Sequence, residues 1–104
     1  MIDVWINCPD DATARTIGRA LVEERLAACA NVFPAIWSAY HWEGEVETAD
    51  EVPLLVKSRG ALWDALRRRV EALHPYDVPS IVAVPAVRVN ERYARWLEEE
   101  TQTP

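Results

Sequence analysis

Two cysteines and one histidine carry the side chains best suited to hold a metal ion. His74 can ligate Cu(II) or Zn(II) through a neutral imidazole, and Cys8 can supply a soft sulfur ligand. Each has a structural alternative, because His74 can end a helix before Pro75 and Cys8 can pack as a small hydrophobe. Cys29 lies in an apolar run between two alanines, so packing is its favoured interpretation.

A second set of polar side chains lies in two loops. Tyr76 and Asp77 can form a polar pair at a cleft, with Asp77 as a general base if its carboxylate is buried. The alternative is a loop in which Asp77 accepts backbone N–H bonds. His41 and Trp42 lie beside a predicted turn, where packing at the surface or in an interface is the alternative to ligand binding.

Five carboxylates fall within nine residues and have no basic residue among them: Glu43, Glu45, Glu47, Asp50 and Glu51. Such a cluster can hold a hard cation loosely. A charged strand edge that resists aggregation is the favoured interpretation.

The segment from Cys29 to Arg59 predicts two long strands joined by a turn at 42–45. A strand with one solvated face should alternate apolar and polar residues, but this first strand is apolar on both faces. One face carries Phe33, Ala35 and Trp37, and the other carries Val32, Ile36, Tyr40 and Trp42. Pro34 and Pro53 each indicate a bulge or an edge, because proline cannot donate to a strand ladder. The surplus apolar surface favours self-association.

The remaining elements follow from hydrophobic periodicity. Strand patterns cover 2–7 and 81–84. Helical patterns begin after Asp10 and after Gly60, and a last helix follows Asn90. The order is β-α-β-β-α-β with an extra C-terminal helix, so we expect an α+β, ferredoxin-like fold with a long hairpin. Two right-handed crossovers place both main helices on one sheet face and leave the other face open.

The 104 residues fit a single domain over 1–104, with an ordered core over 1–100 and a loose tail over 101–104. The formal net charge of -6 excludes a general nucleic-acid binder. No apolar run is long enough for a membrane span, and no signal peptide is recognisable. Two cysteines in such a chain predict a reducing, cytoplasmic compartment, where a Cys8–Cys29 disulfide is not expected.

Three motifs in matching order give the chain its family resemblance: Arg25–Asn31 (RLAACAN), Tyr40–Gly44 (YHWEG) and His74–Pro79 (HPYDVP). Together they resemble the CutA family of divalent-cation tolerance proteins from about Ile2 to Leu97. The resemblance implies a ferredoxin-like subunit, a homotrimer built by sharing the long hairpins, and a role linked to copper and other divalent metals. It implies no accepted catalytic activity.

The copper ligands of bacterial family members carry over only in part. His74 matches the second histidine of the family pair, while Leu73 occupies the place of the first. Ile6 stands where the family cysteine falls, and Cys8 is displaced by two residues. A copper site copied unchanged is therefore not expected.

Three functions remain open at this point. The first is a non-enzymatic homotrimer whose metal contacts come from His74 and Cys8, assisted by carboxylates of a neighbouring subunit. The second is a module resembling the PII signal proteins, with a small ligand where the hairpin tip (His41, Trp42) and the His74–Pro79 loop (Tyr76, Asp77) meet a neighbour. The third is an acylphosphatase-type hydrolase, ranked last because the turn after the first strand is acidic.

Overall fold

The computed structural model describes residues 1–103. Its elements are β1 (Ile2–Cys8), α1 (Asp11–Glu23), β2 (Cys29–Val32), β3 (Ile36–Trp42), β4 (Glu45–Ser58), the short 3-10 turn η1 (Gly60–Leu62), α2 (Trp63–Leu73), β5 (Ile81–Pro85) and α3 (Glu91–Glu100). The predicted α+β class is confirmed. The predicted element order is also found, once β2 and β3 are counted as two halves of one interrupted strand.

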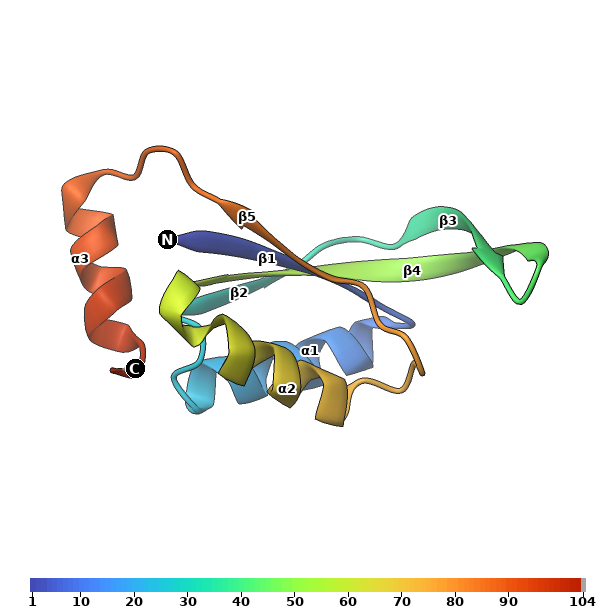
Figure 1. Ribbon diagram of the computed structural model, residues 1–104, viewed down its shortest axis with the longest axis horizontal. Helices are drawn as coiled ribbons and strands as arrows, with labels where there is room; N and C mark the ends of the chain where they lie inside the picture. The colour runs from blue at the N-terminus through green and yellow to red at the C-terminus, as the bar shows by residue number, and fades with distance from the viewer. Residues whose placement is uncertain (104) are drawn as a thin grey trace.

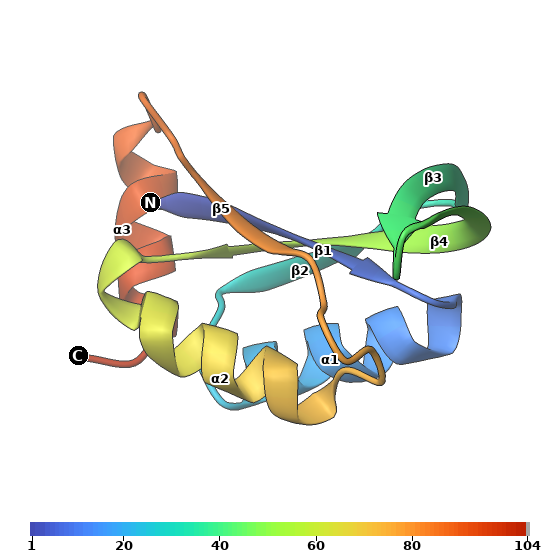
Figure 2. The same ribbon diagram turned by 45° about the vertical axis from the view of Figure 1, so that its right-hand side comes forward.

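All strand pairs are antiparallel, and the sheet order is β2-β4-β1-β5, with β3 paired to the first half of β4. Figure 1 shows α1 and α2 together on one face of this sheet. Beyond the helices, β3 and the start of β4 extend as an arm, defined here as residues 36–51. Figure 2 shows that the arm curls at its far end.

The interruption between β2 and β3 lies at Pro34, as predicted. Val32 pairs with Leu54 and Ile36 pairs with Glu51. Between these two pairs the chain advances four residues from β2 to β3 but only three residues along β4. This one-residue excess is a bulge. Pro53 lies opposite this bulge, within strand β4, as predicted. Its carbonyl accepts from the Phe33 N–H (3.0 Å), so its missing N–H faces the interruption and breaks no ladder bond.

The arm closes with a two-residue turn at Glu43 and Gly44, as the sequence predicts. Their φ angles are 49° and 81°. Two successive positive φ angles are typical of the type I′ turn, whose twist matches that of antiparallel strands.

The core lies between the helices and one sheet face. It contains alternate residues of β1 and β4 together with the apolar stripe of each helix: Val4, Ile6, Cys8, Leu54, Val56, Ile17, Leu21, Leu66 and Val70. Helix α1 begins as predicted, with Thr13 N–H donating to Asp10 Oδ1 at 2.7 Å. This bond lowers the pKa of the Asp10 carboxyl. Helix α2 ends at Leu73, and His74 is extended, which agrees with the effect expected of Pro75.

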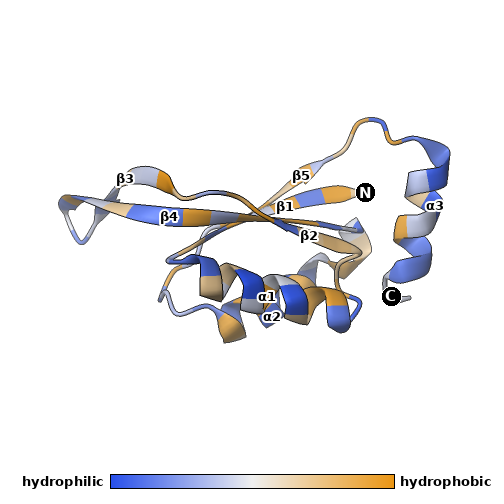
Figure 3. Ribbon diagram, turned by 180° about the vertical axis from the view of Figure 1, so that it is seen from behind, coloured by the Kyte–Doolittle hydropathy of each residue, from blue (hydrophilic) through white to orange (hydrophobic). Residues whose placement is uncertain are grey.

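The arm and the open sheet face leave many large apolar side chains exposed, among them Trp5, Phe33, Ile36, Trp37, Val46, Val82 and Val84. Trp37 is 70% exposed and Val46 is 68% exposed. Figure 3 shows hydrophobic segments along the arm, which has no helix against it. One chain therefore does not cover its own hairpin.

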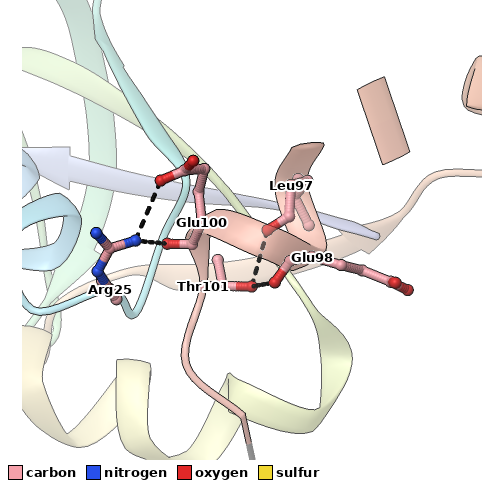
Figure 4. A network of polar contacts seen from close by, with 5 residues as sticks. All are labelled: Arg25, Leu97, Glu98, Glu100 and Thr101. Carbon is pink, nitrogen blue, oxygen red and sulfur yellow. Dashed lines mark hydrogen bonds and ion pairs between the residues drawn. The ribbon is translucent and has the colours of Figure 1, made fainter. Parts of the chain in front are cut away.

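The C-terminal segment differs from the loose tail expected after residue 100. Thr101 is buried, and its hydroxyl donates to the Leu97 carbonyl at 2.9 Å. Arg25 contacts both the carbonyl and the carboxylate of Glu100 (Figure 4). Gln102 N–H donates to the Arg25 carbonyl at 2.8 Å. The carbonyls of Glu24 and Arg25, just after α1, thus hold Gln102 in place, while Pro104 lies outside the described residues.

Asn90 stands at the predicted start of α3, but its side chain makes no capping bond there. Among residues 1–103, no helix is both long and apolar enough to cross a bilayer.

Candidate functional site

A groove of about 790 Å³ lies between the arm and the segment that follows α2. The arm contributes Trp37, Ser38, Ala39, Tyr40, His41, Trp42, Glu47 and Glu51, and the rest of the chain contributes Asn7, Tyr76, Val78 and Ser80. This volume is in the range of small-molecule sites. The groove thus joins residues separated by more than thirty positions in the chain.

The strand register determines which arm side chains share one face of the groove. Tyr40 pairs with Glu47, Trp42 with Glu45, and Ile36 with Glu51. Directly opposed residues of an antiparallel pair point to the same side, and so do residues two apart. Tyr40, Trp42, Glu47 and Glu51 therefore belong to one face of the arm.

Glu51 is the buried acid of the groove. Only 7% of the residue is exposed. The Tyr76 hydroxyl donates to its Oε2 at 3.2 Å. Burial and the nearby Glu51 carboxylate raise the pKa of Tyr76 to about 12, so the hydroxyl stays protonated and remains a donor.

His74 lies behind this pair as a buried link between elements. Its Nε2 is 2.8 Å from the Asn7 carbonyl, and Tyr76 N–H donates to its Nδ1 at 3.1 Å. A carbonyl can only accept, so Nε2 carries the proton and Nδ1 is the acceptor. Both ring nitrogens are thus engaged within the chain.

Cys8 is fully buried on the helix-facing side of β1. Desolvation raises the pKa of its thiol to about 11, with smaller contributions from the carboxylates of Asp10 and Glu51. The thiolate is the form that binds metals and attacks electrophiles. Cys8 is therefore a neutral core residue in the folded chain.

The other candidates are more dispersed. His41 and Trp42 line the groove with Tyr76, whereas Asp77 is exposed and does not line it. Cys29 lies on the opposite sheet face from Cys8. Its Sγ is 3.5 Å from the hydroxyl of Tyr93, a residue of α3. Both thiols are free, and their placement on opposite faces excludes a disulfide between them.

No group of three or more His, Cys, Asp and Glu side chains in the described part of the chain is arranged to hold a metal ion. As folded, Cys8 and His74 offer neither a thiolate nor a free ring nitrogen. The groove instead offers aromatic surface, two carboxylates and a tyrosine hydroxyl, which suits reversible binding of a ligand.

The family model described as CutA1 divalent ion tolerance protein matches residues 2–100. The chain belongs to this family. The CutA resemblance carried by the three sequence motifs is thereby confirmed.

Curated relatives agree with the CutA assignment. The divalent-cation tolerance protein CutA of Thermus thermophilus is 51% identical over 98 residues, which cover 94% of this chain and 95% of that protein. The chloroplastic CutA 1 of Oryza sativa is 40% identical over 97% of this chain. The chain spans 57% of the rice protein and 63% of a zebrafish homologue, so these two CutA proteins are longer.

Solved CutA structures share the fold. The T. thermophilus CutA1 structure matches with a TM-score of 0.94 at 50% identity, covering 98% of this chain and all of that one. A structure named as a periplasmic CutA, from Archaeoglobus fulgidus, has the same TM-score at 35% identity and covers 98% of this chain and all of that one.

Sequence reasoning missed Glu51 as a site residue and grouped it with the exposed carboxylates of the arm. A signal was present, since Glu51 directly precedes the buried run of residues 52–56. That position places it where the arm enters the core.

Proposed function

We propose that this CutA protein is a non-enzymatic homotrimer that acts in divalent-cation tolerance. The observation that carries the proposal is the arm, whose apolar side chains no part of residues 1–103 covers. The names of the relatives, as divalent-cation tolerance proteins, support the biological role and indicate no catalysis.

The arm is suited to assembly by strand addition. Among residues 1–103, β3 pairs only with β4, so its outer edge presents free backbone groups beside exposed Ile36 and Trp37. An exposed, apolar strand edge is a template for pairing with another chain. Three copies can close such head-to-tail contacts into a ring, which leaves no arm unpaired.

The proposal includes metal binding by His74 and Cys8, assisted by carboxylates of a neighbouring subunit. The folded chain does not present these two as free donors. Binding there requires His74 to release one ring nitrogen and Cys8 to lose its proton.

Equilibrium dialysis with Cu(II) tests the metal part. If the pair binds metal, His74→Ala and Cys8→Ser each bind less Cu(II) than the wild type, while His41→Ala serves as the control for removing a histidine. Equal binding in all four proteins would remove His74 and Cys8 from the proposal.

A second candidate is a module resembling the PII signal proteins, which binds a small ligand at the groove. The 790 Å³ volume and the hydrogen bond from the Tyr76 hydroxyl to buried Glu51 favour it. A ligand that binds only the folded protein raises its melting temperature. A metabolite thermal-shift screen in which no compound raises the melting temperature would count against this candidate.

The hydrolase candidate receives no support from the groove. Phosphate sites need cationic side chains or clustered backbone N–H groups. The groove lining contains neither Lys nor Arg.

We propose a cytoplasmic location for the chain. Its two free thiols on opposite sheet faces support a reducing compartment. Family membership alone fixes no compartment, because relatives are named chloroplastic and periplasmic. We expect cell fractionation to recover the chain in the soluble cytoplasmic fraction.

A further inference from the structure

We propose that the exposed face of α3 receives the arm of a neighbouring copy, with Arg92 and Arg95 facing the carboxylates of that arm. This inference rests on the proposed homotrimer and names the surface that its arm meets. It competes with the second candidate function, because both place an occupant on the same face of the arm.

The basic residues of the chain differ in whether the chain itself supplies a partner. Most of them form a salt bridge or a hydrogen bond inside it: Arg15, Arg19, Arg25, Lys57, Arg59, Arg67 and Arg69. Within residues 1–103, no such contact involves the side chains of the others, which are Arg68, Arg88, Arg92 and Arg95. All but Arg68 lie in α3 or just before it. The C-terminal helix therefore carries positive charge that its own chain does not neutralise.

The unpaired arginines of α3 lie beside an exposed aromatic ring. Arg92 is three residues from Arg95 and four from Trp96, so the three share one face of the helix. Together with Glu99, the one acid of the set, they line a shallow hollow. Trp96 is 39% exposed, with its ring centroid 5.4 Å from that of Tyr93. This face suits a partner that is both acidic and apolar.

One face of the arm has the complementary chemistry. Tyr40 lies directly opposite Glu47, and Trp42 directly opposite Glu45, so these four side chains point to the same side. All four are exposed in the single chain. No Lys or Arg lies between residues 36 and 51. A guanidinium group pairs with carboxylates and stacks on aromatic rings, so this face suits Arg92 and Arg95.

The two surfaces cannot meet within one chain. Figure 1 shows the arm and α3 at opposite ends of the molecule, whose longest extent is 45 Å. In a closed ring of head-to-tail contacts, one surface of each copy meets a different surface of the next. An arm at one end and its receiving helix at the other satisfy that condition.

The charges select the position of the arm more than they hold it there. An exposed ion pair contributes little free energy, whereas like charges brought together at an interface strongly disfavour association. Burial of Tyr40, Trp42 and Trp96 supplies most of the attraction at this contact. Charge reversal is therefore the most sensitive test.

Exchange of subunits between trimers labelled with donor and acceptor dyes measures the contact, because interface changes act mainly on the dissociation rate. In Arg92→Glu/Arg95→Glu, carboxylates would face the carboxylates of the arm. We expect exchange about tenfold faster than in the wild type, or loss of the trimer. Arg15→Glu/Arg68→Glu makes the same change in net charge on α1 and α2 and should exchange like the wild type. A wild-type rate in the α3 variant would overturn the proposal.

A reciprocal change on the arm tests the pairing itself. Glu45→Arg/Glu47→Arg, added to the α3 variant, reverses the charge of both surfaces in every copy. We expect this chain to form a trimer that exchanges within about threefold of the wild-type rate. Because it retains both α3 substitutions, recovery would exclude misfolding of α3 as the cause of faster exchange. Without recovery the proposal fails.

The wild-type mass separates this inference from the proposed function. A wild-type monomer would overturn both. A wild-type trimer whose exchange does not respond to charge reversal on α3 would overturn only the contact between α3 and the arm.

Discussion

The Cys8 thiol keeps its proton because burial in the core disfavours the charged thiolate. Its pKa is raised from 9.0 to about 11. The unfolded chain therefore loses this proton at lower pH than the folded chain does. The stability from Cys8 is fully present below pH 9.0 and is lost as pH rises to about 11.

We predict that the free energy of unfolding of the wild type falls through this window by about 3 kcal/mol more than that of Cys8→Ala. The raised pKa values of Tyr76 and Tyr93, each about 12, add a fall in an overlapping range in both proteins, and Cys8 is only the last-ranked cause of the Tyr76 shift. Urea unfolding below and above the window measures the difference. Parallel pH profiles for the two proteins would show that the thiol is not desolvated.

His74 stabilises the chain by joining the end of α2 to β1. We predict that His74→Phe, which keeps an aromatic ring but removes both ring nitrogens, lowers the free energy of unfolding by about 2 kcal/mol. The Asn7 carbonyl and the Tyr76 N–H would lose their partners. His41→Phe is the matched control and should change stability little, because His41 is exposed. Urea unfolding compares the two, and equal losses would refute a linking role for His74.

At the scale of single residues, the sequence predicts positions better than partners. Pro75 makes His74 the end of a helix, and that is where it lies. Nothing in the chain order reveals that the ring meets Asn7, sixty-seven positions earlier. Glu51 shows the same limit, because its hydrogen-bond partner Tyr76 lies twenty-five positions later in the chain.

The turn of the arm depends on a backbone conformation that glycine tolerates and other residues resist. At Gly44, φ is 81° and an added Cβ would meet nothing within 4 Å. We predict that Gly44→Ala lowers stability by about 1 kcal/mol through backbone strain alone. At Gly60 the space is equally open and φ is not positive, so Gly60→Ala is the control. Thermal unfolding that ranks Gly60→Ala as the more damaging change would contradict this account.

At the scale of elements, periodicity and turn chemistry predict most boundaries. The turn at residues 43–44 and the break at Pro34 follow from local chemistry. The docking of Gln102 could not be predicted, because its partners are the distant carbonyls of Glu24 and Arg25, just after α1. Pro53 also follows from local chemistry, because its missing N–H faces the bulge at residues 33–35.

The whole molecule is defined by an arm that its own core does not cover. We predict that Trp37→Glu, which places a charge on this arm, shifts the protein from trimer toward monomer. An unpaired charge buried in an interface disfavours association. Val87→Glu is the control, because Val87 is 92% exposed in the loop before α3. Sedimentation velocity measures both variants, and a trimeric Trp37→Glu protein with wild-type stability would place the interface elsewhere.

The most direct test of the account is the mass of the wild-type protein in solution. Light scattering behind size exclusion should give three times the chain mass of 11.8 kDa. A trimer at that mass agrees with an arm that needs neighbouring copies to cover it. A stable monomer of 11.8 kDa would contradict the assembly on which the proposed function depends.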